Sequence, residues 1–269
     1  MLRNLRAAIV PPFLSNWAVQ RSKYTAKFEQ VDTWTQAVSG SVGYSDPGII
    51  SRVDTATRSV MAGNAVFERD GTLFTEPNIR WPVLAGLLQA HARDGYLRVV
   101  DFGGALGSVY WQHRSNLAGL DVAWAVVEQE NFVQRGGSLP TTEVTFFNDL
   151  ELALATVAPN VILFSSVLQY LADPLALLSR VIQETQATII IDRTPMSTSP
   201  VNVPVIQRVP DHIYTASYPA WIISQSELDL CLAPRDSQFV FDGIEPNART
   251  DKGLLVSWHG RLAIPARTV

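Results

Sequence analysis

The sequence has one cysteine, Cys231, and four histidines among 269 residues. One thiol cannot form an internal disulfide or a multi-thiolate metal site, so the cysteine usage favours a reduced, intracellular protein. The histidines are dispersed along the chain, and none belongs to a His-x-Glu pattern or to a carboxylate cluster with metal-ligand spacing. No metal site is therefore expected.

Long apolar runs and an excess of positive charge are also missing. No run approaches the roughly 18–20 residues that a membrane-spanning helix needs. The net charge is −4, and the chain has neither a basic recognition module nor an Asp/Asn-Pro-Pro-Tyr motif, so nucleic acid is not an expected partner. A hydrophobic content of 47% with 17% charged residues excludes wholesale disorder and is ordinary for a globular chain.

Acidic residues are missing from the stretch 1–28, whereas basic residues are frequent there. Those basic residues are Arg3, Arg6, Arg21, Lys23 and Lys27. Pro11 and Pro12 interrupt the apolar patch and no small-residue cleavage site follows, so a secretory signal peptide is not expected. We interpret the segment as a solvated basic arm, with weak contact to an anionic membrane surface as the alternative. The expected location is the cytoplasm, with peripheral contact at the inner membrane face in that alternative.

From Leu97 onward, short apolar strands alternate with helical segments. The expected strands are 97–102, 122–128, 143–147, 160–167, 187–192, 238–244 and 252–260. The expected helices lie between Pro47 and Gly63, within 80–93, after Ser108, and over 130–136, 150–157, 174–185 and 226–233. Apolar strands separated by helices indicate a parallel sheet covered on both faces, whereas the last two strands have no helix between them and form an antiparallel pair.

This pattern divides the chain into two regions. Residues 1–93 are expected to form the basic arm and a helical cap, with the stretch from Phe28 to Arg93 helical and irregular. Residues 94–269 form the expected α/β core. The connection 193–223 is unusually long for a link between a strand and a helix, so we expect a loop on the acceptor side, where long loops are often functional.

A glycine cluster follows the first strand of the core, in the stretch RVVDFGGALGSVYW. The dinucleotide fingerprint needs glycine at relative positions 1, 3 and 6, and counting from Gly103 these positions hold Ala105 and Ser108 instead. No Gly-Lys-Ser/Thr follows, which excludes a P-loop. What remains is Asp101 followed by Gly103 and Gly107, at the place where a doubly wound sheet binds a cofactor.

Polar residues also end the next two strands. Glu128 lies 21 residues beyond Gly107, where a carboxylate can accept hydrogen bonds from both ribose hydroxyls of a nucleoside. This feature alone fits NAD as well as other nucleoside cofactors. Asn148 and Asp149 end the third strand, where an Asn-Asp pair is also ordinary turn chemistry.

Taken together, these residues resemble motif I of class I methyltransferases that use S-adenosylmethionine (SAM), written Asp/Glu-x-Gly-x-Gly-x-Gly. Ala105 replaces the central glycine and Gly104 is an additional one. The antiparallel pair at the end of the chain also resembles that fold, whose strand order is 3-2-1-4-5-7-6 with an antiparallel last strand. The segments ERDGTLF, RVVDFGGALGSVYWQHR, VVEQENFVQRG, ILFSSVLQYLADP, IIIDRTP and IYTASYPAWIIS further resemble a group of bacterial methyltransferases linked to surface-polysaccharide biosynthesis, from Trp34 to the end.

The resemblance implies a Rossmann-like, doubly wound seven-stranded α/β sheet with SAM as cofactor. The residues implied to hold the cofactor are Asp101, Gly103, Gly104, Ala105, Gly107, Glu128, Gln129, Asn148, Asp149, Ser165 and Ser166. The pair Ser165-Ser166 has a second interpretation, as the cap of the following helix.

Methyl transfer to a hydroxyl requires alignment of the acceptor and removal of its proton. His212 is the candidate general base because its ordinary pKa suits proton removal near neutrality, and Asp192 is the alternative. The candidate acceptor-binding residues are Glu68, Arg69, Gln169, Tyr170, Arg193, Tyr214, Tyr218 and Trp221. Among them the aromatic rings either stack on a sugar or pack as a wall, and Arg193 or Arg208 is suited to an anionic group.

The expected function is therefore SAM-dependent methylation of a small molecule or glycan, at oxygen rather than nitrogen, with a lipid-linked acceptor if the basic arm docks on a membrane. Two alternatives remain. One is an NAD(P)-dependent oxidoreductase or epimerase, which Ala105, Ser108 and the antiparallel finish disfavour. The other is a catalytically degenerate methyltransferase fold that acts as a binding or scaffold subunit in glycan assembly.

Overall fold

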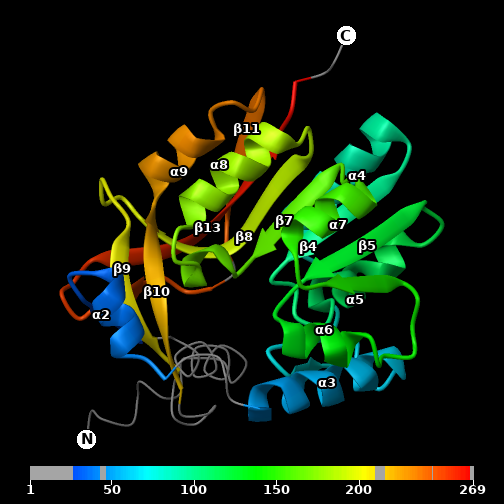
Figure 1. Cartoon of the computed structure of the whole chain (residues 1–269), viewed down its shortest axis with the longest axis horizontal. Helices are drawn as coiled ribbons and strands as arrows, with labels where there is room; N and C mark the ends of the chain where they lie inside the picture. The colour runs from blue at the N-terminus through cyan, green and yellow to red at the C-terminus, as the bar shows by residue number, and fades with distance from the viewer. Residues whose placement is uncertain (1–26, 43–46, 210–215, 244, 267–269) are drawn as a thin grey trace, which may run out of the picture.

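The computed structural model describes residues 27–42, 47–209, 216–243 and 245–266. Its central feature is a twisted sheet with helices packed on both faces (Figure 1). Within the described ranges, no helix is both long and apolar enough to cross a membrane.

The core of the sheet contains seven strands. They are β4 (Leu97–Phe102), β5 (Val122–Val127), β6 (Val144–Phe147), β7 (Val161–Ser165), β8 (Thr188–Ser197), β11 (Ser237–Asp242) and β13 (Leu255–Ile264). Their order in space is β6-β5-β4-β7-β8-β13-β11. Strands β4 to β8 pair in parallel, and β13 runs antiparallel to both β8 and β11. Numbered along the core, this is the order 3-2-1-4-5-7-6, so the predicted fold class is confirmed.

Alternation along the strands explains why both faces carry helices. Val99, Val126, Leu163 and Ile190 belong to one core, which α4 (Trp81–Asp94) and α5 (Ser108–His113) cover. On each of these four strands the following residue belongs to the opposite core, beneath α7 (Leu150–Val157), α8 (Pro174–Glu184) and α9 (Gln225–Leu232); these residues are Val100, Val127, Phe164 and Ile191. Because successive side chains of a strand point to opposite faces, a continuously apolar strand must be buried on both sides.

The N-terminal region contains more strand than the sequence predicted. Its elements are β1 (Lys27–Gln30), α2 (Trp34–Ser39), α3 (Pro47–Met61), β2 (Phe67–Arg69) and β3 (Thr72–Phe74). Helix α3 and helix α4 were expected, but the hairpin β2–β3 was not. Asp70 and Gly71 form its turn with φ angles of 51° and 76°, and this Asp-Gly pair is a known hairpin signal.

The expectation of a long loop over 193–223 is wrong. This segment continues β8 and then forms β9 (Val203–Arg208) and β10 (Ser217–Ser224), which pair with each other antiparallel. Strand β1 adds to the free edge of β9, and β10 pairs with the end of β8 in parallel. We call β1, β9 and β10 the wing. Alternate side chains of the wing are buried against Phe28 and Val256; they are Val205, Ala220 and Ile222. Side chains that point to one face at every second residue favour an extended strand.

Candidate functional site

The glycine turn between β4 and α5 has an unusual backbone. Gly103, Ala105 and Gly107 have φ angles of 72°, 52° and 86°, so three of five consecutive residues lie in the left-handed region. The amide of Gly103 donates to the carbonyl of Val127 at 2.9 Å, which ties the turn to the end of β5. A Cβ atom on Gly103 would overlap the side chain of Val167. Position 103 therefore has no room for a residue larger than glycine.

Gly104 has a different role, because it covers the carboxyl group of Asp101. A Cβ at Gly104 would come within 2.5 Å of Asp101 Cγ. Asp101 is fully buried, and Trp124 Nε1 donates to its Oδ2 at 3.2 Å. Its Oδ1 has no hydrogen-bond partner among the residues that the structure describes. Burial raises the pKa of Asp101 to about 7.

Glu128 lies over the same turn from the end of β5. Its Oε1 accepts a hydrogen bond from the amide of Ala105 at 3.3 Å, and its Oε2 accepts one from the amide of Gln129 at 2.8 Å. The side chain is half-buried, and burial raises its pKa above the ordinary range for glutamate. Gln129 is exposed and precedes α6 (Glu130–Gly136). The carboxylate thus faces the glycine turn, and its predicted role as a ribose ligand stays a prediction.

The residues that end β6 divide into two roles. Asp149 Oδ1 accepts the amide of Leu152 at 2.7 Å and caps α7, so the interpretation of Asp149 as turn chemistry fits this contact. Asn148 is exposed, and its Nδ2 donates to Glu130 Oε2 at 2.6 Å. Glu130 was missed by the sequence analysis, since its approach to Asn148 depends on the packing of two separate connections.

Polar atoms without partners gather at the end of β7. Gln169 Nε2 donates to Ser166 Oγ at 3.1 Å. Within the described part of the chain, however, neither Gln169 Oε1 nor Ser165 Oγ has a hydrogen-bond partner, although both atoms are buried. Ser166 adopts a left-handed φ of 58°, and its amide donates to the carbonyl of Asp192 at 2.9 Å. Buried polar atoms are normally paired, so these two atoms are exceptions within the described residues.

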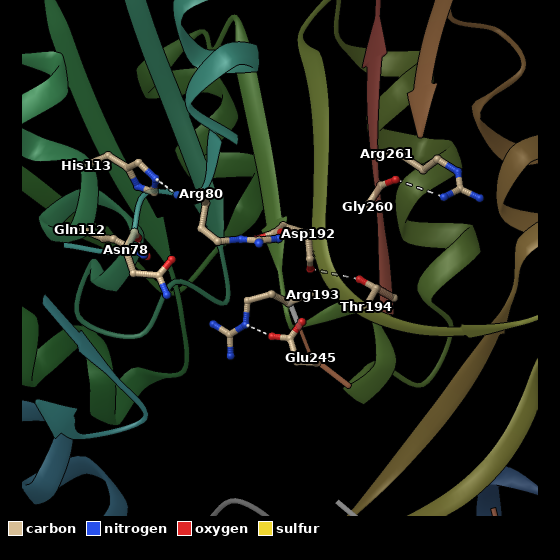
Figure 2. Close-up of polar contacts among 10 residues, drawn as sticks. All are labelled: Asn78, Arg80, Gln112, His113, Asp192, Arg193, Thr194, Glu245, Gly260 and Arg261. Atoms are coloured by element: carbon tan, nitrogen blue, oxygen red, sulfur yellow. Dashed lines mark hydrogen bonds and ion pairs between the residues drawn. The ribbon is translucent and has the colours of Figure 1, made fainter. Parts of the chain in front are cut away.

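Asp192 does not fit the predicted role of a general base. It is 1% exposed, and both of its carboxylate oxygens bind Arg80, with 3.1 Å between Arg80 Nε and Oδ2 (Figure 2). The amide of Arg80 donates to His113 Nε2 at 3.2 Å, and His113 Nδ1 donates to the carbonyl of Val109 at 2.9 Å. Burial lowers the pKa of His113, which agrees with this neutral tautomer. Arg80 and Asp192 are a buried ion pair that fixes the middle of β8 to the start of α4.

Arg193 lies beside this pair and faces acidic side chains. Its backbone φ is 52°, and its Nε donates to Glu245 Oε1 at 3.2 Å (Figure 2). Its Nη2 lies 3.7 Å from Asp70 Oδ2. Arg193 therefore connects three parts of the fold: strand β8, the hairpin β2–β3 and the segment before β12 (Ala248–Arg249).

Glu68 anchors the hairpin β2–β3 next to the glycine turn. It is 2% exposed, and it accepts hydrogen bonds from Ser108 Oγ and, at 3.0 Å, from the amide of Gly71. Burial raises its pKa. Arg69, the next residue, projects to the other side of the strand, with its guanidinium 5.8 Å from the Phe67 ring and 5.9 Å from the Phe74 ring.

The aromatic candidates in the wing pack as a wall. Trp221 stacks on Trp34 with 5.0 Å between ring centroids, and its Nε1 donates to the carbonyl of Leu171 at 3.1 Å. Tyr218 is 2% exposed, with its ring 6.0 Å from that of Tyr170. The Tyr170 hydroxyl donates to Gln207 Oε1 at 3.1 Å, and burial raises its pKa to about 12. The packing interpretation therefore fits Trp221 and Tyr218.

Three predicted residues lie elsewhere. His212 and Tyr214 fall outside the described residues. Arg208 forms an exposed ion pair with Glu29 on the edge of the wing, with 2.6 Å between Arg208 Nη2 and Glu29 Oε2, and is not gathered at the glycine turn. A groove of about 440 Å³ between α8 and α9 is lined by Leu175, Ile182, Leu230 and Cys231 among others, and contains none of the predicted site residues.

No family model and no curated protein sequence matches this chain. Among solved structures, the N-terminal domain of EvdMO1 in the presence of SAH and D-fucose is similar at 17% identity and a TM-score of 0.47, over 81% of this chain and 99% of that one. The 1,6-didemethyltoxoflavin-N1-methyltransferase of Burkholderia thailandensis has 14% identity and a TM-score of 0.36, over 89% and 96%. Human N-acetylserotonin methyltransferase has 12% identity and a TM-score of 0.43, over 68% of this chain and 52% of the other.

Proposed function

We propose that this protein is a SAM-dependent methyltransferase that acts on a small molecule. The observation that carries the proposal is the glycine turn itself, with Glu128 above it and Asp101 beneath it. The turn lies at the carboxyl ends of β4 and β5, next to the centre of a sheet with the order 3-2-1-4-5-7-6. Doubly wound sheets bind their ligands at that edge, where strand order reverses.

The residues present fit a nucleoside with a positively charged tail. The exposed part of the Glu128 carboxylate can accept the two ribose hydroxyls, while the turn from Gly103 to Gly107 lets a ligand approach the backbone closely. The unpaired Oδ1 of Asp101 suits an ammonium group, directly or through water. We propose that Gln129, Asn148 and Glu130 contact the adenine base; Asn148 and Glu130 are hydrogen-bonded to each other. When bound, SAM supplies the methyl group on its sulfonium.

The acceptor side comprises the end of β7, the hairpin β2–β3 and Arg193. Gln169 Oε1 and Ser165 Oγ provide unpaired polar atoms there. The buried ion pair of Arg80 and Asp192 joins α4 to β8 beside Arg193. We propose that the acceptor is an oxygen of a glycan or a related small molecule, with surface-polysaccharide biosynthesis as the setting that the sequence resemblance favours. His212 stays the proposed general base because its ordinary pKa suits proton removal from a hydroxyl at neutral pH.

Isothermal titration with SAM and S-adenosylhomocysteine tests the cofactor. The wild type is expected to bind both, and Glu128→Ala is expected to bind at least about 10-fold more weakly, since a charge-assisted hydrogen bond contributes about 1.5–3 kcal/mol. Glu151→Ala removes an exposed carboxylate of α7 that pairs with Arg180, and serves as the matched control with unchanged affinity.

Absence of SAM binding by the folded wild type would contradict the proposal, and binding of NAD(H) instead would favour an oxidoreductase. Tight SAM binding with no methylated product from any acceptor in a panel of sugars and small hydroxylated molecules would favour a scaffold role. Incorporation of radiolabelled methyl from SAM is the readout that separates the enzyme from the scaffold.

A further inference from the structure

Three guanidinium groups lie close together on the acceptor side, and only two of them are paired. Arg80 binds both oxygens of Asp192, and Arg193 binds Glu245 and Asp70. Arg69 forms no ion pair within 4.0 Å with any acidic group of the described residues. Its Nη2 is buried and has no hydrogen-bond partner among those residues either.

Arg69 is held in this position by the hairpin rather than by a charge. The tight Asp70–Gly71 turn fixes the strand pair, and the stacked rings of Phe67 and Phe74, 4.5 Å apart, lie under the guanidinium. Glu68 fastens the same strand to Ser108, the first residue of α5. The side chain thus stays in place without a polar partner, which an arginine on an exposed loop would not do.

The charges around Arg69 explain what it can bind. Burial and the positive charge of Arg193 lower its pKa to about 10, so the group is still protonated at neutral pH. Glu245 and Asp70 offset part of that repulsion; Arg193 contacts Asp70 Oδ2 and Glu245 Oε1, while Glu245 Oε2 is buried without a hydrogen-bond partner among the described residues. An arginine N–H that is buried without an acceptor is unfavourable, and a bound anion removes that penalty. The planar guanidinium fork matches the oxygens of a carboxylate or a phosphate.

Resting on the proposed methyltransferase function, we propose that the acceptor carries a carboxylate or phosphate group, and that Arg69 binds this anion through Nη2, beside Arg193. The position supports this assignment. Arg69 points away from Glu68, and its guanidinium interacts electrostatically with Arg193, Glu245 and Asp70, so an anion on Arg69 lies on the same side of the hairpin as Arg193. A neutral sugar would leave the Arg69 charge unpaired.

Anion binding is tested directly with inorganic phosphate and acetate as probes, at constant ionic strength against sodium chloride, in the presence and absence of S-adenosylhomocysteine. An anion at ten times its Kd raises the ratio of folded to unfolded protein about 11-fold, which corresponds to a rise in Tm of about 3–5 °C for a chain of this size. The wild type is expected to show that shift. A larger shift with phosphate indicates a phosphorylated acceptor, and a larger shift with acetate indicates a carboxylated one.

Arg69→Met keeps the apolar stem and removes the charge, so it is expected to abolish the shift. Arg180→Met, on exposed α8, is the matched control and is expected to keep it. Arg69→Lys keeps the charge but not the planar fork, so several-fold weaker binding is expected, and this variant carries the test if Arg69→Met does not fold. An equal shift in wild type and Arg69→Met, or no shift with either anion, would overturn the proposal.

Titration of SAM into Arg69→Met separates this inference from the proposed function. Unchanged SAM affinity together with loss of anion binding is the expected result. Loss of SAM affinity in the folded variant would place Arg69 in the cofactor site and contradict an acceptor role. Failure of the wild type to bind SAM would overturn the methyltransferase proposal, whereas the anion measurement would still report whether Arg69 binds an anion.

Discussion

The indole of Trp124, on β5, donates a hydrogen bond of 3.2 Å to Oδ2 of Asp101 on the neighbouring β4, and this is the only hydrogen bond to that carboxyl group among the described residues. Because Asp101 is fully buried, one neutral donor does not replace the water that a carboxylate loses on folding. The pKa of about 7 follows from that imbalance. The ionised form is held at the cost of stability, as is common in functional sites.

Asp101→Asn is expected to change the pH dependence of stability. The folded pKa lies above the unfolded value of about 3.9, so the contribution of Asp101 is fully favourable below pH 4 and is lost as the pH rises through 7. The amide cannot ionise, so this variant should match the wild type near pH 4 and exceed its free energy of unfolding at pH 8 by up to the order of 4 kcal/mol. Urea denaturation of both proteins between pH 4.5 and 8 measures the difference; parallel curves would show that Asp101 is not a buried carboxyl with a raised pKa.

The buried pair of Arg80 and Asp192 predicts strong energetic coupling. Asp192→Leu leaves the Arg80 guanidinium buried and unpaired, at an expected cost of about 3–5 kcal/mol in the free energy of unfolding. Arg80→Met combined with Asp192→Leu removes both charges and should cost less than the sum of the single variants. Denaturant unfolding of the four proteins gives the coupling energy, and additive costs would refute a tight pair.

Asp192 also illustrates why a site residue can be misjudged from sequence. A carboxylate directly after an apolar strand has the right place for a base, and its partner Arg80 lies 112 positions earlier in the chain. Nothing near Arg80 in the sequence indicates that contact, because it depends on how α4 packs across β8. Periodicity predicts which residues are buried, but not which buried charges pair.

The core of the fold, in contrast, follows from local patterns. Strand β4 was predicted with its observed bounds, and the parallel sheet with its antiparallel last pair follows from apolar runs and the missing helix before the last strand, whereas the order of the strands was implied by the family resemblance. The wing was missed because the long connection over 193–223 was interpreted as a loop, and Pro204 and Pro219, which lie within its strands, are not typical strand residues. Prolines are tolerated where the sheet ladder does not need their amide, a condition that the sequence does not display.

Ala105 stands where the methyltransferase motif has glycine, and we expect its replacement by glycine to stabilise the protein. At a φ of 52° an alanine pays a steric penalty of about 1–2 kcal/mol, part of which the greater flexibility of glycine in the unfolded chain cancels. Ala105→Gly should therefore raise the free energy of unfolding by up to about 1 kcal/mol and keep or improve SAM affinity.

Ala105→Val is the opposing variant, since a β-branched residue is poorly tolerated at positive φ, and it should lower both quantities. Thermal unfolding and SAM titration of the two variants check the prediction. If Ala105→Gly were less stable than Ala105→Val, the left-handed backbone at this position would be wrong.

Gly103 and Gly119 provide a matched pair that separates backbone strain from close packing. Both have positive φ, 72° and 83°, but a Cβ on Gly103 would overlap Val167 whereas one on Gly119 meets nothing within 4 Å. Gly119→Ala should cost only the strain of about 1–2 kcal/mol and leave SAM affinity unchanged. Gly103→Ala should cost about 1–3 kcal/mol more, because Val167 must move, and should weaken SAM binding by shifting the turn. Urea denaturation and titration of both variants measure these effects; equal losses of stability would mean that the turn is not packed against the end of β7, and equal SAM affinities would mean that it is not the cofactor cradle.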